Sequence, residues 1–160
     1  MNKAVFLDRD GIINIERGDY TWRIEDFKFN ESIFEFLKTL QKKGYLFIII
    51  TNQGGISKKL FTHNDVIKLH EFMLNKFSDN DINITDLYYC PHHSNIEKCL
   101  CRKPNSLMIE KAIARYNIDI KQSYFIGDSR RDFLAGEKAG VKAIQVKKNS
   151  DLNEILQTIK

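Results

Sequence analysis

The stretch Ala4–Gly11 reads AVFLDRDG and joins a short apolar run to a pair of acids. Apolar residues without interruption predict a buried strand of a parallel sheet, because helices cover such strands on both faces. Asp8 and Asp10 follow the run directly, and Gly11 permits a sharp turn after them. We therefore expect both aspartates at the carboxyl end of a buried strand.

Apolar runs and helical patterns alternate along the rest of the chain. Each run of strand length precedes a segment whose apolar residues recur at helical spacing. Strand then helix, repeated along the chain, predicts an α/β fold: a Rossmann-like parallel sheet sandwiched by helices. No linker or repeat interrupts residues 1–160, so we expect a single domain. The predicted strands are 4–7, 46–50, 87–89, 124–126 and 141–146, and the predicted helices are 33–43, 62–77, 106–116, 133–139 and 151–159.

Length and composition exclude several classes of protein. Of the 160 residues, 42% are hydrophobic and 29% are charged, which is typical of a globular chain rather than a disordered one. No apolar run approaches the ~20 residues of a membrane-spanning helix, so we expect no membrane association. The net charge of +4 is spread along the chain without a basic stripe, so we expect no nucleic acid partner.

The cysteines and the N-terminus bear on location. Three cysteines cannot all pair with one another, and secreted disulfide scaffolds usually contain more of them. The first residues do not have the pattern of a secretory signal. We therefore expect a cytoplasmic protein, and we expect it to be a monomer.

Polar side chains follow most of the predicted strands. The triplet Thr51-Asn52-Gln53 follows the second strand, and Gly127-Asp128-Ser129 follows the fourth. Because ligands of parallel sheets bind beyond the carboxyl ends of the strands, we expect these residues beside Asp8 and Asp10. Three carboxylates, those of Asp8, Asp10 and Asp128, repel one another unless a hard cation neutralises them. Oxygen ligands with room for water suit Mg²⁺.

Mg²⁺ often bridges to a substrate phosphate. Thr51, and Lys103 from the loop after the third strand, could then hold phosphoryl oxygens. The residues at this edge therefore indicate a phosphorylated substrate. The alternative is a purely structural cluster of acids.

All three cysteines lie in residues 90–101, here named the cysteine loop. The pattern is Cys-x-His followed by Cys-x-Cys, and four such ligands can form a tetrahedron around Zn²⁺. The alternative is reduced cysteines that pack as small apolar residues. His92 or His93 could be the fourth ligand, and the matching spacing of the two pairs favours His92. We expect a structural zinc that orients the next two cations, with these ligands: Cys90, His92, Cys99 and Cys101.

The other two histidines, His63 and His70, show no partner pattern. Both lie at or inside the predicted helix 62–77, and we expect them at the surface or on a helix face. We assign neither of them a functional role.

Four motifs together resemble those of the haloacid dehalogenase (HAD) superfamily of phosphatases, over about residues 4–146. Within the superfamily, Asn14, the segment 26–29 and the cysteine loop resemble two groups: the D-glycero-D-manno-heptose 1,7-bisphosphate phosphatases and the histidinol-phosphate phosphatases. The four motifs are Asp8-Arg9-Asp10-Gly11, Thr51-Asn52-Gln53, Cys101-Arg102-Lys103-Pro104 and Gly127-Asp128-Ser129-x-x-Asp132.

The resemblance implies a HAD-like phosphatase of carbohydrate metabolism that uses Mg²⁺ and Zn²⁺. Asp8 would attack phosphorus and become an aspartyl phosphate, while Asp10 would protonate the leaving oxygen and then activate water. Mg²⁺ would bind Asp8, the backbone carbonyl of Asp10, and Asp128. The remaining residues would contact the phosphate or substrate, or support the metal or its neighbouring lysine: Thr51, Asn52, Arg102, Lys103 and Asp132.

The spacing of the motifs leaves no room for an inserted cap domain. Only a helix and loops separate Asp8 from Thr51, and the segment from Thr51 to Lys103 is filled by a helix, a strand and the cysteine loop. Loops must therefore control access to the site. Tyr20 and Trp22 are candidates to line its entrance.

The leading hypothesis is a phosphatase of a small phosphorylated metabolite, namely the 7-phosphate of D-glycero-D-manno-heptose 1,7-bisphosphate. The stretch between His92 and Cys99 is short for the heptose enzymes and closer to the histidinol type. Histidinol-phosphate phosphatase is therefore the alternative. A non-catalytic, zinc-stabilised binding module is a third hypothesis, but such a module would not need both Asp8 and Asp10.

Overall fold

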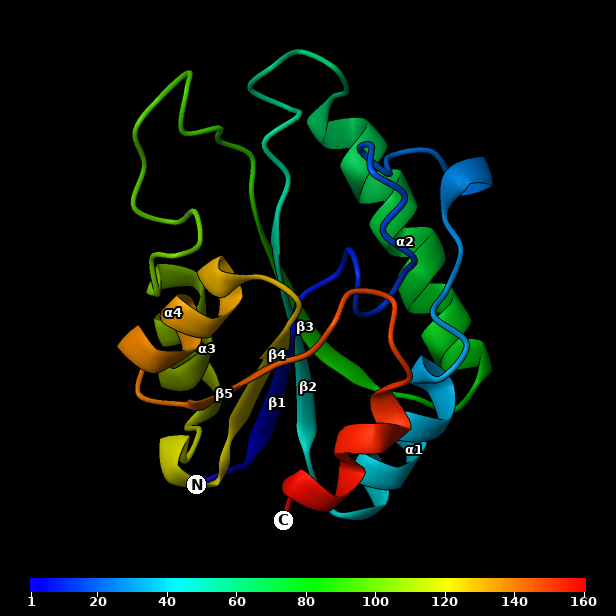
Figure 1. Ribbon diagram of the computed structural model, residues 1–160, viewed down its shortest axis with the longest axis vertical. Helices are drawn as coiled ribbons and strands as arrows, with labels where there is room; N and C mark the ends of the chain where they lie inside the picture. Colours follow the sequence, from blue (N-terminus) through cyan, green and yellow to red (C-terminus); the bar gives the residue numbers. More distant parts are fainter.

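The computed structural model describes every residue from Met1 to Lys160. Its centre is a five-stranded parallel sheet with the strand order β3-β2-β1-β4-β5 (Figure 1). The predicted α/β architecture is confirmed. The strands are β1 (Ala4–Leu7), β2 (Leu46–Asn52), β3 (Ile84–Cys90), β4 (Tyr124–Gly127) and β5 (Lys142–Gln145).

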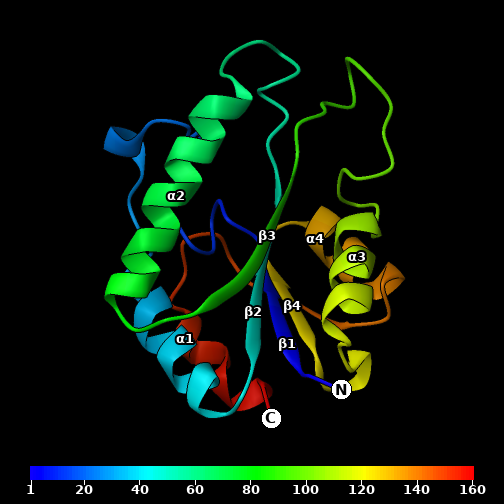
Figure 2. The same ribbon diagram turned by 180° about the vertical axis from the view of Figure 1, so that it is seen from behind.

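Helices cover both faces of the sheet (Figures 1 and 2). Side chains alternate along β1, so Val5 and Leu7 enter one hydrophobic core while Ala4 and Phe6 enter the other. The first core lies under α1 (Ile33–Lys42), α2 (His63–Asp79) and the 3₁₀ helix η3 (Leu152–Thr158). The second lies under α3 (Leu107–Tyr116) and α4 (Arg130–Lys138). Two short 3₁₀ turns are η1 (Ile24–Asp26) and η2 (Ile120–Gln122).

Three predicted elements differ from the structure by three residues at one end or in the type of helix, and the others agree to within two residues at each end. β3 begins at Ile84 rather than at 87. It is an edge strand whose residues are mostly half-buried, so it tolerates polar residues near its start, and these interrupt the apolar pattern used for the prediction. The predicted helix 133–139 begins earlier, at Arg130, because Ser129 and Asp132 form a capping box. The C-terminal segment is the 3₁₀ helix η3 instead of an α-helix.

The longest loops follow the carboxyl ends of the strands, at the top of Figure 1. They include the loop after β2 and the cysteine loop after β3. The connections contain no additional domain over the sheet (Figures 1 and 2). None of the helices combines the length and the apolar character needed to cross a bilayer.

Candidate active site

A pocket of about 480 Å³ lies at the carboxyl ends of β1, β2 and β4. Thr51 is not in its wall: this residue is buried, and its Oγ1 accepts a hydrogen bond of 2.9 Å from Nε2 of Gln53, which does line the pocket. The predicted residues in the wall are Asp8, Asp10, Tyr20, Asn52, Arg102, Lys103, Asp128 and Asp132.

Asp8 follows β1 and contacts a buried lysine. Its Oδ1 lies 2.8 Å from Nζ of Lys103 and accepts a 2.7 Å hydrogen bond from the backbone N–H of Arg9. Burial, assisted by the charge of Asp132, raises the pKa of Asp8 to about 8, although the charge and hydrogen bond of Lys103 act in the opposite direction. A further cation beside Asp8 would therefore stabilise its ionised form.

Lys103 is buried between two aspartates. Its Nζ lies 2.6 Å from Oδ1 of Asp132 and donates to the backbone carbonyl of Ile50 at 2.8 Å. Burial alone would lower the pKa of Lys103, but the two carboxylates raise it, so the ammonium stays charged. Asn52 holds the same residue through its backbone: Nδ2 donates to the Lys103 carbonyl at 3.1 Å, and Oδ1 accepts from the Lys103 N–H at 3.0 Å.

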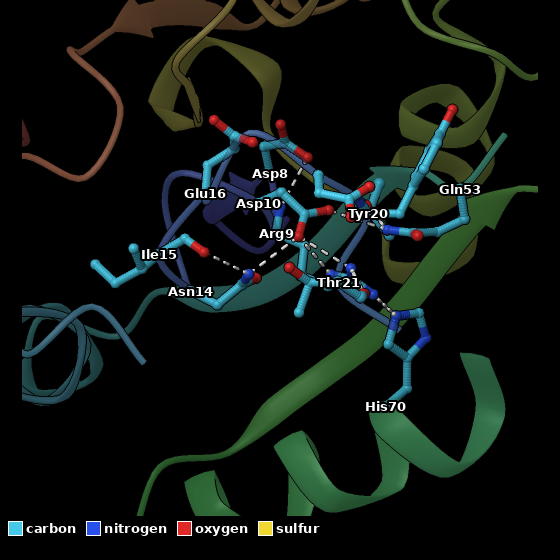
Figure 3. A network of polar contacts seen from close by, with 12 residues as sticks. Asp8, Arg9, Asp10, Asn14, Ile15, Glu16, Tyr20, Thr21, Gln53 and His70 are labelled. Carbon is cyan, nitrogen blue, oxygen red and sulfur yellow. Dashed lines mark hydrogen bonds and ion pairs between the residues drawn. The ribbon is translucent and has the colours of Figure 1, made fainter. Parts of the chain in front are cut away.

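The Asp10 carboxylate accepts hydrogen bonds from three side chains (Figure 3). Oδ1 accepts from Nη2 of Arg9 at 2.9 Å and from Nδ2 of Asn14 at 3.0 Å, and Oδ2 accepts from Nε2 of Gln53 at 3.2 Å. Burial would raise the pKa of Asp10, but the charge of Arg9 and these hydrogen bonds outweigh it and lower the pKa. Asp8 and Asp10 are thus placed in opposite electrostatic environments.

His70 is the clearest correction to the sequence analysis. It is buried rather than exposed, and its Nε2 lies 3.1 Å from Nη1 of Arg9 (Figure 3). The sequence shows no pattern for this contact, because a contact between α2 and the loop after β1 cannot be deduced from local spacing. His63, at the start of the same helix, is exposed as expected.

Asp8, Asp128 and Asp132 form a carboxylate cluster, in which one oxygen from each residue lies within 4.8 Å of the others. Burial and the charge of Asp132 raise the pKa of Asp128 as well. Gly11 packs against this cluster with a φ of +90°, and a Cβ there would lie 2.3 Å from Oδ2 of Asp128, so the predicted turn is confirmed. This set of oxygen ligands fits Mg²⁺.

Asp132 differs from the other two members of the cluster because both of its oxygens already have partners. Oδ1 pairs with Lys103, and Oδ2 accepts a 2.6 Å hydrogen bond from Oγ of Ser129. Asp8 and Asp128 are therefore the members best suited to hold a metal ion. Asp132 instead supports Lys103.

The cysteine loop brings one ligand atom from each of Cys90, His92, Cys99 and Cys101 within 4.8 Å of the others. Sγ of Cys90 lies 3.7 Å from Sγ of Cys99, and Nδ1 of His92 lies 3.3 Å from Sγ of Cys101. Sγ of Cys101 lies closer to Sγ of Cys90, at 3.0 Å, than the roughly 3.8 Å that Zn–S bonds of about 2.3 Å give in a tetrahedral site. Three thiols and one imidazole gathered in this way are a donor set that fits Zn²⁺. His93 is not part of the group.

Cations line the side of the pocket next to the cysteine loop. Nη1 of Arg102 donates to the His92 carbonyl at 2.8 Å, so the position of this guanidinium depends on the loop. Neither Arg102 nor Arg131 forms an ion pair with an acid. Burial and the nearby charge of Arg131 lower the pKa of Arg102. This side of the pocket is therefore complementary to an anion.

Sequence reasoning missed several residues of this site. Arg131 and Lys148 line the pocket, and Arg9 and His70 support Asp10 from outside it. Arg131 lies inside the Gly127–Asp132 motif, which was a usable signal. Lys148 follows β5 without a motif, so only the fold reveals it.

Sequence comparison identifies close relatives of this chain. A family model described as HAD-hydrolase-like matches residues 100–160. The D-glycero-alpha-D-manno-heptose-1,7-bisphosphate 7-phosphatase of Campylobacter jejuni is 44% identical over 139 residues, which cover 87% of this chain and 78% of the relative. The corresponding beta-anomer 7-phosphatase of Haemophilus ducreyi is 45% identical over 146 residues, covering 88% and 80%.

Comparison with solved structures supports the same fold. The D,D-heptose 1,7-bisphosphate phosphatase of B. bronchiseptica, crystallised with magnesium and phosphate, has a TM-score of 0.85. The match covers 98% of this chain and 86% of that one, at 24% sequence identity. This similarity confirms the HAD-like arrangement of the sheet and helices.

Proposed function

The chain belongs to the D-glycero-D-manno-heptose 1,7-bisphosphate 7-phosphatase family of HAD-like hydrolases, and we propose that it hydrolyses the 7-phosphate of heptose 1,7-bisphosphate through an aspartyl phosphate on Asp8. The observation that supports this most directly is the convergence of all four motifs on one pocket. A phosphatase needs a nucleophile, an acid–base group and phosphate-binding cations together. This pocket contains residues of each type.

Asp8 is the proposed nucleophile. Both of its hydrogen-bond donors contact Oδ1, so Oδ2 is available to form the bond to phosphorus. As that bond forms, the bond between phosphorus and the sugar oxygen breaks, and the phosphoryl group is transferred to Asp8. The ammonium of Lys103, which contacts Oδ1 of Asp8, can then donate a hydrogen bond to a phosphoryl oxygen while it keeps its charge.

Asp10 is the proposed acid–base residue. In its protonated form it donates to the departing sugar oxygen, and in its ionised form it removes a proton from the water that hydrolyses the aspartyl phosphate. Hydrogen bonds from Arg9, Asn14 and Gln53 orient the carboxylate for both steps. Their donors stabilise the ionised form, which the second step requires.

We assign Mg²⁺ to Asp8, Asp128 and the backbone carbonyl of Asp10. The carboxylate cluster fits a hard cation, and the raised pKa values of Asp8 and Asp128 are the response expected of acids that a cation would stabilise. Bound Mg²⁺ would neutralise charge on the transferring phosphoryl group. Asp132 keeps Lys103 in place beside this centre.

We assign a structural Zn²⁺ to Cys90, His92, Cys99 and Cys101. The four donor atoms already face one another, and a four-ligand site has no position open to substrate. The backbone N–H of Arg102 lies 3.4 Å from Sγ of Cys99. Zinc in the loop would therefore fix the start of the segment that contains Arg102 and Lys103.

The cations beside the cysteine loop support a substrate with a second phosphate. Arg102 and Arg131 lack acidic partners, and both lie in the wall of the pocket that contains Asp8. A bisphosphate places its reacting phosphate at Asp8 and requires positive charge for the other. Histidinol phosphate has a single phosphate and a cationic amine, which two arginines would repel.

One panel of substrates tests the proposal. We expect the highest kcat/KM for heptose 1,7-bisphosphate, with the two anomers assayed separately because the relatives include both specificities. Histidinol phosphate and a 3′-phosphorylated oligonucleotide should react at least about 10²-fold more slowly. A higher value for histidinol phosphate would replace the substrate assignment. Equally weak rates on every substrate would favour the hypothesis of a non-catalytic binding module. Separately, size-exclusion chromatography of the same sample tests the prediction that the protein is a monomer.

A further inference from the structure

Asp10 is oriented by hydrogen bonds more than by packing. Its side chain is 30% exposed, whereas that of Arg9 is 1% exposed. A partly exposed carboxylate can rotate unless its donors are themselves fixed. Arg9 contributes both Nη2 at 2.9 Å and Nε at 3.3 Å to the same oxygen of Asp10, which also accepts from Asn14 at 3.0 Å. The guanidinium thus supplies two of the three hydrogen bonds that fix this oxygen.

Arg9 is held from two other parts of the chain (Figure 3). Its Nη2 donates to the backbone carbonyl of Thr21 at 2.6 Å, and its Nη1 contacts Nε2 of His70 at 3.1 Å. Thr21 lies in a loop, whereas His70 lies in the middle of α2, a helix that packs on the sheet. A rigid helix thus reaches the guanidinium opposite Asp10.

His70 has to act as a hydrogen-bond acceptor at this contact. A guanidinium has only donors, so Nε2 of His70 must be unprotonated. Burial, assisted by the charge of Arg9, lowers the pKa of His70 to about 3, which keeps the ring neutral at physiological pH. A neutral acceptor satisfies Nη1 without neutralising the guanidinium, whose full charge remains directed at Asp10. An acid at position 70 would compete with Asp10 for that charge.

We propose that His70 is a positioning residue for the phosphatase reaction: through Arg9, it holds the Asp10 carboxylate in the orientation needed for proton transfer. This inference rests on the proposed function, because it gives His70 a role only if Asp10 is the acid–base group. His70 itself does not line the pocket. Its loss would leave a buried N–H of Arg9 without a partner and allow the guanidinium to turn away from Asp10.

Two variants of similar size separate the hydrogen bond from the bulk of the side chain. In His70→Gln, the longer amide can place an acceptor near the position of Nε2, whereas in His70→Asn the amide is too short. We expect His70→Asn to lower kcat on the sugar bisphosphate between about 10- and 100-fold with little change in KM. His70→Gln should stay within about threefold of the wild type.

The choice of leaving group distinguishes positioning of Asp10 from a general structural defect. Dinitrophenolate leaves 2,4-dinitrophenyl phosphate without needing a proton, so formation of the aspartyl phosphate should be unaffected in His70→Asn. Rapid mixing should show a burst of dinitrophenolate at the wild-type rate, followed by slower turnover, because Asp10 is still needed to activate water. The alkyl phosphate should instead lose rate in the first step.

The matched control is His63→Gln. His63 lies on the same helix, and its Nδ1 is 2.9 Å from the hydroxyl of Tyr89, whose ring also packs edge-on against His70. However, His63 is exposed and does not reach Arg9. We expect wild-type kinetics on both substrates. Melting temperatures of all three variants show whether they are folded.

If His70→Asn folds, two outcomes would overturn the inference. Equal slowing of its dinitrophenolate burst and of its reaction with the sugar bisphosphate would show that His70 has a structural role only. Wild-type kinetics of the same variant would show that His70 has no role. If His70→Asn does not fold, wild-type-like kinetics of His70→Gln support the inference, and a loss in His70→Gln that is equal for both substrates contradicts it. Retained turnover in Asp8→Asn would instead refute the proposed function, so the two failures are distinguishable.

Discussion

The reacting side chains and the cysteine loop are positioned by different means. Asp8 follows a central buried strand, and its partner Lys103 is held by Asp132 and by the Ile50 carbonyl, groups that are far apart in the sequence. The ligands of the cysteine loop all lie within residues 90–101. The loop buries little apolar surface of its own, since Ile96 and Leu100 are 54% and 77% exposed.

This difference predicts how far each part of the molecule depends on the metal ion assigned to it. The geometry around Asp8 results from the two hydrophobic cores and from ion pairs, so it should persist without Mg²⁺. In the cysteine loop only the cysteines pack against a hydrophobic core, so the conformation of the residues between them should depend on Zn²⁺. Four predictions test this contrast, beginning with the largest effect.

Asp8→Asn should remove activity without removing the fold. An amide cannot form the aspartyl phosphate, so we expect kcat to fall by more than about 10³-fold. The melting temperature should stay the same or rise, because a buried acid next to Asp132 is removed. Steady-state kinetics and calorimetry on the same sample measure both. Activity close to that of the wild type would remove Asp8 as the nucleophile.

Lys103→Met should reduce both activity and stability. It leaves Asp8 and Asp132 close together without the cation between them, so the free energy of unfolding should fall by about 3 kcal/mol. We expect kcat/KM to decrease by about 10²-fold or more. Denaturant titration gives the stability change.

The control for Lys103→Met is Lys148→Met. Lys148 pairs with Glu16 at 2.8 Å, but its side chain is 58% exposed. Removing this solvent-exposed ion pair should change the free energy of unfolding far less than Lys103→Met does. Equal losses of unfolding free energy in Lys103→Met and Lys148→Met would contradict the view that buried ion pairs position the reacting groups.

Cys99→Ser should affect the cysteine loop first and the reaction second. We expect loss of bound zinc and a fall of about 3 kcal/mol in the free energy of unfolding. Activity should fall about 10- to 100-fold, which is the usual effect of removing a residue that orients a site without contacting the substrate. Metal analysis, denaturant titration and kinetics measure the three effects. Ile96→Ser, at an exposed position of the same loop, should retain zinc and stability. Absence of zinc in the wild-type protein purified without chelators would remove the assignment.

The last prediction concerns the pH dependence of stability without Mg²⁺. The pKa of Asp8 is raised from 3.8 to about 8 in the folded state, mainly by burial. The folded protein then keeps a proton that the unfolded chain releases between these values, so stability should fall as pH rises from 5 to 8. We expect the melting temperature to fall by roughly 3 °C or more, and added Mg²⁺ to reduce this change.

The pH series is measured in Mg²⁺-free buffer without chelators, so that zinc remains in the cysteine loop. Asp8→Asn is the control and should show a flatter melting temperature over the same range. If the melting temperature of Asp8→Asn falls with pH as steeply as that of the wild type, the effect arises from other titratable groups. A slope that Mg²⁺ does not alter would contradict the proposed role of Asp8 as a metal ligand.

Local patterns predicted most elements of the fold. Uninterrupted apolar runs revealed β1, β2 and β4, because buried parallel strands need apolar side chains on both faces. The start of β3 escaped prediction, because Thr85 and Asp86 lie on an edge strand that does not require burial. The 3₁₀ form of the C-terminal helix also escaped, because its apolar spacing does not distinguish it from an α-helix.

The sequence alone determined which chemical groups this protein can bring to a site: the acids after β1 and β4, and the cysteine and histidine ligands of residues 90–101. Local order along the chain suffices for these, because strand direction sends all the carboxyl ends to one edge of the sheet. Only the tertiary structure decided how the groups are paired. The contacts of Lys103 with Asp132 and of Arg9 with His70 join distant segments, and burial between those segments gives each contact its energetic effect.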